Sequence, residues 1–190
     1  MFDRGFKTWC EKVASSFRSD LGVGPHDPLD PRKLAAHLRV VVWRIEEIPG
    51  IPPECVRTLL ADSESWSAAT VVEGNRHAII LNSAHSLPRQ NSDLMHELSH
   101  LIRAHTPARM DISPDGLLLL STYDKKQEDE ANWLAGCLLL PRATLIRSLQ
   151  LRLSVAGIAT KYGASEEMTK YRINVTGVEY QLVRTSRKNA

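Results

Sequence analysis

The chain has 190 residues, of which 43% are hydrophobic and 24% charged, and its net charge is +2. This composition supports an ordinary buried core and excludes a disordered chain, and the small net charge gives no indication of a nucleic-acid partner. The odd number of cysteines argues against a disulfide framework, and the absence of a signal-peptide stretch or a run of ~20 apolar residues predicts a cytoplasmic protein without membrane contact.

The first part of the chain alternates helical and extended patterns. Residues 6–21 have helical spacing of apolar side chains, and a loop rich in Gly, Pro and Asp follows. Asp30 and Pro31 are typical of a helix start. The β-branched run 40–45 predicts a strand, and a short helix is expected between about residues 53 and 60.

Two further strands are predicted at residues 67–72 and 77–81, joined by a polar turn that suits a hairpin. Two interpretations of residues 77–81 stay open. The segment is either an edge strand that pairs with an extended peptide, or an ordinary core strand, which its apolar run favours equally.

The most informative motif is an H-E-x-x-H pentad formed by His96, Glu97 and His100. Side chains four residues apart share one face of a helix, so the two imidazoles can hold one metal ion, and Glu97 can act as general base toward the attacking water. Pro88 suits the first turn of this helix. The alternative is an amphipathic helix with surface histidines and no metal.

Residues 106–124 form the least regular segment, and we expect a loop that crosses the cleft. Near it lie three candidates for stabilising the oxyanion of a hydrolysis reaction, namely His105, Arg109 and Tyr123. The sequence does not choose among them. His105 is also expected as a cation at the C-terminus of the pentad helix.

A second helix is predicted at residues 127–140, and it begins with acids. A catalytic zinc site normally has three protein ligands, and the third must come from a separate element. We choose Glu128, because Asn132 lies four residues on and can accept the ring N–H of a ligand histidine. Glu130 is the competitor and Asp129 ranks third. Acids that only favour the helix dipole are the alternative.

The C-terminal residues 155–168 are similar to a helix-turn-helix, with Ser165 as the cap of the second helix. If this unit bound DNA, Lys170 and Arg172 would face phosphates or bases. Glu166 and Glu167 would repel phosphate there, so the sequence argues against direct DNA binding. We favour a helical pair that packs against the rest of the protein or docks its substrate.

Taken together, these motifs resemble the ImmA/IrrE metallopeptidases. The similarity covers roughly residues 75–145, and its pattern is a strand ending in Asn82, the H-E-x-x-H helix, and a second helix with the motif E-x-E-A-N. The resemblance implies that His96, His100 and Glu128 are zinc ligands and that Glu97 is the catalytic base. It also implies cleavage of a helix-turn-helix repressor that is encoded nearby.

The chain departs from the family pattern at a few positions. Ser99 replaces a glycine of the pentad and Leu134 replaces a phenylalanine. Many relatives have a histidine eight residues after the first ligand, where this chain has Ala104, and His105 follows one residue later. His105 therefore inherits no role from the family. None of the changes removes an implied ligand.

The sequence thus predicts an α+β protein. It has a small zincin-like, gluzincin-type domain at residues 1–145 and a helical, helix-turn-helix-like region at residues 146–190. The expected activity is zinc-dependent hydrolysis of a peptide bond in a repressor, with Mn²⁺ or Fe²⁺ as alternatives to Zn²⁺. The rivals are a DNA- or protein-binding module, or a toxin–antitoxin component, with a structural metal. A zinc hydrolase with a different substrate is a further rival.

Overall fold

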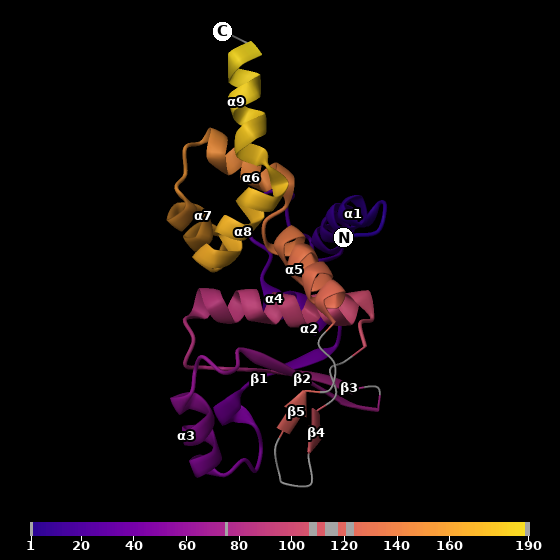
Figure 1. The fold of residues 1–190 in the computed structure, drawn as a ribbon, viewed down its shortest axis with the longest axis vertical. Coiled ribbons are helices and arrows are strands. Elements are labelled where there is room, and N and C mark those ends of the chain that lie inside the picture. The colour runs from indigo at the N-terminus through magenta and orange to yellow at the C-terminus, as the bar shows by residue number, and fades with distance from the viewer. Residues whose placement is uncertain (1, 75, 107–109, 113–117, 121–123, 189–190) are drawn as a thin grey trace.

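The computed structural model describes residues 2–188 except 75, 107–109, 113–117 and 121–123. It is a mixed α+β fold that is mostly helical, as the sequence predicts (Figure 1). The strands are β1 (Val40–Arg44), β2 (Ala68–Glu73), β3 (Arg76–Leu81), β4 (Met110–Ile112) and β5 (Leu118–Leu120). The helices are α1 (Phe6–Asp20), α2 (Pro31–His37), α3 (Pro53–Ala61), α4 (Leu87–Arg103), α5 (Lys125–Leu139), α6 (Arg142–Gln150), α7 (Val155–Tyr162), α8 (Glu166–Thr176) and α9 (Val178–Lys188), with a 3-10 turn η1 (Ile45–Glu47).

The main sheet has three strands in the order β1-β3-β2. β2 and β3 form the predicted antiparallel hairpin, in which Ala68 pairs with Leu81, and β1 pairs in parallel with the opposite side of β3. The interpretation of residues 77–81 as an edge strand is therefore wrong. β3 is the central strand, which agrees with its apolar run and with the burial of Ile79 and Leu81.

Helices α4 and α5 form the layer that carries the functional residues. α4 lies across one face of the sheet, and α5 crosses α4 on the side away from the sheet (Figure 1). α4 begins with Pro88 in its first turn and buries Leu94 and Leu98 in the core. α5 is capped by Asp124 and buries Leu134 and Leu138. The apolar faces of both helices thus fix how their polar faces meet.

The segment 106–124, which the sequence predicts to be a loop, contains two short strands. Its described part includes β4 and β5, which pair in an antiparallel manner with Met110 opposite Leu120. The prediction of a loop without strands is therefore wrong for these residues. A short local pair of this kind gives only three residues of alternation in each strand, which is too little for a periodicity argument.

The C-terminal helices pack onto the rest of the molecule. Gly163 adopts a left-handed conformation at the end of α7, and the side chain of Ser165 caps α8 by accepting from the Met168 N–H, as predicted. α8 packs against α5. Ile158 and Ile173 belong to the same hydrophobic cluster as the core of α4 and α5. The division at residue 145 stays a prediction.

Arg172 is one of the two residues that would face DNA if the helix-turn-helix-like unit bound it, and the structure turns it inward. Its side chain is fully buried, donates to the Leu140 carbonyl and forms an ion pair with Glu11. It therefore cannot face a phosphate or a base. Lys170 remains exposed beside Glu166. Within the described part of the chain, no helix combines the length and apolar character needed to cross a bilayer.

Candidate metal centre

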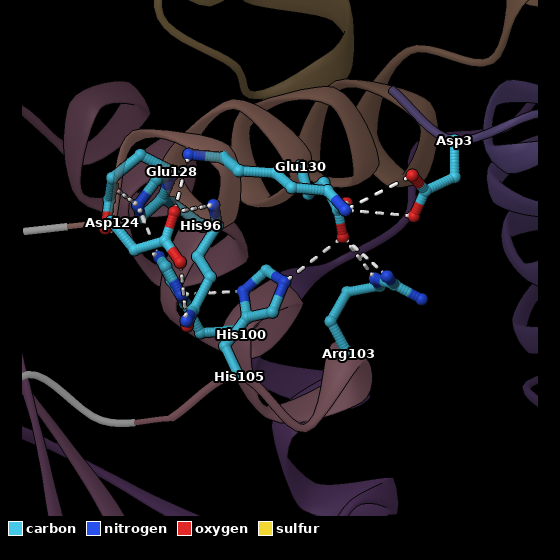
Figure 2. Close-up of polar contacts among 10 residues, drawn as sticks. Asp3, His96, His100, Arg103, His105, Asp124, Glu128 and Glu130 are labelled. Atoms are coloured by element: carbon cyan, nitrogen blue, oxygen red, sulfur yellow. Dashed lines mark hydrogen bonds and ion pairs between the residues drawn. The ribbon is translucent and has the colours of Figure 1, made fainter. Parts of the chain in front are cut away.

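The two histidines of the pentad meet Glu128 at the crossing of α4 and α5 (Figure 2). His96 Nε2 lies 3.0 Å from His100 Nε2 and 3.1 Å from Glu128 Oε2, and His100 Nε2 lies 3.4 Å from Glu128 Oε1. All three side chains are partly exposed, at 21%, 20% and 33%. The three donors therefore face one point that solvent can reach.

The three side chains lie close enough together to share one ion. Ligands held about 2.0–2.1 Å from a tetrahedral zinc ion lie about 3.3 Å from one another. The two nitrogens lie 3.0 Å apart, and they lie 3.1 and 3.4 Å from different oxygens of Glu128, so the three side chains converge closely enough for one ion to be bound between them. Two imidazoles and one carboxylate are also a donor set that zinc accepts, although manganese and iron accept it too.

Asn132 fixes the orientation of His96. Its Oδ1 lies 3.1 Å from His96 Nδ1, which is the contact that the sequence predicts for this side chain. Because an amide oxygen can only accept, Nδ1 of His96 carries a proton and Nε2 is the nitrogen that faces Glu128 and His100; without a metal Nε2–H donates to the Glu128 carboxylate, and a bound ion would replace that proton. Glu128 and Asn132 lie one turn apart on α5, so the same helix delivers a carboxylate and an orienting group.

Glu97, the predicted base, is held by a residue that sequence reasoning missed. Thr70 Oγ1, on strand β2, donates a hydrogen bond of 2.5 Å to Glu97 Oε2. Burial raises the pKa of the Glu97 carboxyl, while this hydrogen bond acts in the opposite direction. A hydroxyl in an extended strand carries no signal that it will meet a helix 27 residues later.

The charges around the centre favour one protonation pattern. Burial opposes a charge on His96, but the hydrogen bond to Glu128 and the charges of Glu97 and Glu128 outweigh it and raise the pKa of His96. Burial and the charge of His96 lower the pKa of His100 to about 4. The hydrogen bond from His96 lowers the pKa of Glu128. His100 is thus neutral and Glu128 ionised at pH 7, as a metal ligand requires.

The two competing acids lie elsewhere. Asp129 is exposed and pairs with Lys125 at 3.0 Å. Glu130 is 3% exposed and accepts from Arg103 Nε at 2.9 Å, so its carboxylate is engaged away from the donors of His96, His100 and Glu128. The helical rotation between Glu128 and Glu130 explains this separation.

The candidates for oxyanion stabilisation receive little support from the described residues. His105 is buried, and both of its ring nitrogens are engaged, by His100 at 3.0 Å and by Glu130 at 3.4 Å. The sequence offers two roles for His105, an oxyanion donor and a cation at the helix end. Because its side chain is buried and both ring nitrogens have partners, it is neither a free donor nor an exposed cation. Arg109 and Tyr123 lie outside the described residues.

A cavity of about 250 Å³ lies beside the centre, between α4, α5 and α8. Its lining shares His96 and Asn132 with the candidate metal centre, and α8 contributes Met168 and Tyr171. Asp93 of α4 also lines it, and burial raises the pKa of that carboxyl. The C-terminal helices therefore build one wall of a space next to the metal-ligand cluster.

Comparison with known proteins agrees with these motifs. The family model of M78 peptidases, described as the IrrE N-terminal-like domain, matches residues 56–174, which is more than half of the chain. The match includes the pentad helix, α5 and most of α8. No curated protein matches the chain. The match to the family model, together with the His96–His100–Glu128 cluster, shows that the chain belongs to the M78 family of peptidases with an IrrE N-terminal-like domain.

Proposed function

We propose that the protein is a zinc-dependent endopeptidase in which His96, His100 and Glu128 hold the metal and Glu97 is the general base. The observation that carries this proposal is the convergence of the three side chains, whose candidate ligand atoms all lie within 4.8 Å of one another, as three protein ligands of one ion must. Family membership supports the same chemistry. When bound, the metal would polarise the scissile carbonyl and lower the pKa of the attacking water.

The protein's own residues supply the proton transfers. The Glu97 carboxylate accepts the proton of the attacking water and then delivers it to the leaving amine. Its burial suits this role, because a carboxyl with a raised pKa is a stronger base when ionised. Thr70 holds the carboxylate through Oε2 and leaves the other oxygen for the water.

An extended substrate can bind along β2. Among the described strands β2 lies at the edge of the main sheet, and it carries Thr70, so a peptide paired with its outer side would pass close to Glu97. Val71 and Val72 on the same strand are exposed at 47% and 44%. The cavity beside His96 would receive a side chain of that peptide next to the scissile bond.

We infer that the substrate is a helix-turn-helix repressor encoded near the gene, whose cleavage relieves repression. The resemblance to ImmA/IrrE peptidases supports this substrate class. Two observations favour it over the DNA-binding alternative. Arg172 of α8 is buried, and Glu166 and Glu167 are exposed at the start of that helix. A structural metal would normally have four protein ligands, whereas the group found among the described residues has three.

The test is incubation of the zinc-loaded protein with the neighbouring repressor, followed by gel electrophoresis and mass spectrometry of the fragments. We expect a single cleavage by the wild type and none by Glu97→Gln, which should still bind one zinc ion. Cleavage by Glu97→Gln would exclude the assigned base. A fourth protein ligand detected by X-ray absorption, together with an intact repressor, would favour the structural-metal alternative.

A further inference from the structure

His105 lies directly behind His100, on the side away from Glu128. The Nδ1 atoms of the two rings are 3.0 Å apart, and the ring planes meet edge to face with centroids 5.0 Å apart. The other nitrogen of His105, Nε2, lies 3.4 Å from Glu130 Oε2. The His105 side chain is only 6% exposed. Figure 2 shows its ring between His100 and Glu130. His105 therefore links a buried carboxylate to a proposed metal ligand.

The protons on His105 and His100 can be placed by starting from Glu130, the last residue in this series of hydrogen bonds. Glu130 is held by Arg103, whose Nε and Nη2 lie 2.9 and 2.5 Å from Oε2, so the ionised carboxylate can only accept. His105 Nε2 must then carry a proton, which leaves a lone pair on its Nδ1. That lone pair accepts the Nδ1–H of His100, and the Nε2 lone pair of His100 is left to face Glu128 and His96.

The backbone brings His105 to this place by a helix-ending motif. Ala104 has the left-handed angle φ 52°, and the next N–H, that of His105, donates to the His100 carbonyl at 3.0 Å. The N–H of Ala104 donates to the Leu101 carbonyl. These two bonds are the Schellman pattern, which turns the chain back over the last helical turn. A histidine one residue past the left-handed position therefore returns to the ring of His100.

The Glu130 carboxylate is held by Arg103, and Arg103 in turn packs against the N-terminal helix α1. The guanidinium of Arg103 lies 5.2 Å from the ring of Phe6 and 4.9 Å from the ring of Trp9, both on α1. The side chain of Glu130 is 4% exposed, and Lys126 approaches its other oxygen at 3.8 Å. The carboxylate is thus neutralised and fixed in place, as a group that orients a ligand through hydrogen bonds must be.

We propose that His105 and Glu130 form a hydrogen-bonded relay that sets the tautomer and ring orientation of His100 for metal binding. His105 is a positioning residue, since it acts through His100 and contacts neither the metal position nor the substrate. The ring of His96 is oriented by one hydrogen bond, to Asn132, whereas the ring of His100 is oriented through His105 and Glu130. This inference rests on the metal site proposed above.

The first test is zinc affinity, measured with the full-length protein by competition with a chelating dye. His105→Leu keeps the bulk but removes both hydrogen bonds, and we expect affinity to fall about 10- to 100-fold. His105→Asn places an acceptor near the Nδ1 position and should recover most of the loss. Lys170→Ala, which removes an exposed ion pair with Glu166 on α8 and touches no member of the relay, is the matched control and should change affinity less than about twofold.

A double-mutant cycle tests the order of the relay. If Glu130 acts on the metal only through His105, then Glu130→Gln weakens zinc binding in the wild type but has no further effect in His105→Leu. Additive losses would overturn the relay. Urea denaturation of each variant in chelator shows whether it is folded, and His105→Asn keeps the test decisive if His105→Leu is not.

The second readout is the proton NMR signal of the imidazole N–H groups in the zinc-loaded protein. We expect a protected Nδ1–H of His100 in the wild type and its loss by solvent exchange in His105→Leu, with the Nδ1–H of His96 unchanged. Equal zinc affinity and an unchanged His100 signal in His105→Leu would show that His105 only fills space. Failure of the wild type to bind zinc would instead refute the proposed function.

Discussion

The hydrogen bond from Thr70 to Glu97 gives a pH-dependent prediction. Thr70→Val replaces the hydroxyl by a methyl group of similar size and removes the 2.5 Å bond to Glu97 Oε2. The bond favours the ionised carboxylate, so its loss raises the pKa of Glu97 further above its ordinary value. The acidic limb of the pH profile of kcat/KM therefore moves to higher pH.

The size of the effect follows from the energy of the bond. A hydrogen bond to a charged group contributes about 1.5–3 kcal/mol, and part of this remains when the carboxyl is protonated. We take about 1.4 kcal/mol as the difference, which is a factor of about 10. On the acidic side of the profile, kcat/KM should fall about tenfold, while on the plateau, where Glu97 is ionised in both proteins, it should change less than about threefold.

The assay is cleavage of the repressor at several pH values, with zinc content measured in each sample. Thr58→Val is the matched control, because Thr58 donates to the Glu54 carbonyl on exposed α3 and has no contact with the centre. An acidic limb at the same pH in Thr70→Val and wild type would refute the reasoning. A uniform loss at every pH would mean that Thr70 contributes to position and not to the charge of Glu97.

Three further predictions concern the metal, a helix end and acid stability. Glu128→Gln should lower zinc affinity more than about 100-fold in dye competition, since it removes a ligand charge, whereas the exposed neighbour Asp129→Asn should have no effect; equal losses would argue against Glu128 as ligand. Ala104→Gly should raise the free energy of unfolding by up to about 1 kcal/mol in urea, because glycine adopts the left-handed angle freely, and a loss would contradict the Schellman assignment. His100 has a pKa of about 4 in the folded chain against 6.5 normally, so its contribution to stability is complete above pH 6.5 and is lost as the pH falls toward 4. In chelator, His100→Gln should lose less stability than the wild type over this range, and a parallel decline would contradict the assigned pKa.

Local patterns in the sequence predicted most of the elements that carry the centre. The helical pattern of α5, the Pro88 turn of α4 and the hairpin of β2 and β3 all depend on residues close together in the chain, although α5 begins two residues before the predicted start and its cap, Asp124, falls in the predicted loop. The contact between Asn132 and His96 was also predictable, because Glu128 and Asn132 share a helix face. The assignment of Glu128 as third ligand stays a prediction until a metal is measured.

Long-range contacts escaped the sequence analysis. Residues 77–81 fitted both an edge and a core strand, and only the parallel pairing of β1 with β3 decided between them. Glu130 was weighed as a ligand, but its partner Arg103 lies 27 residues away, on another helix. Nothing in the sequence near α8 showed that Arg172 would be buried against Glu11.

The sequence by itself determined which polar side chains share a face within each helix, His96 with His100 and Glu128 with Asn132, because an i, i+4 spacing fixes this within a few residues. The tertiary structure decided what surrounds them. Thr70 reaches Glu97 only because β2 packs beside α4, and His105 reaches His100 only because an alanine adopts a left-handed angle that glycine would ordinarily signal. Helical periodicity is a local property of the chain, whereas these contacts depend on how separate elements bury their apolar faces together.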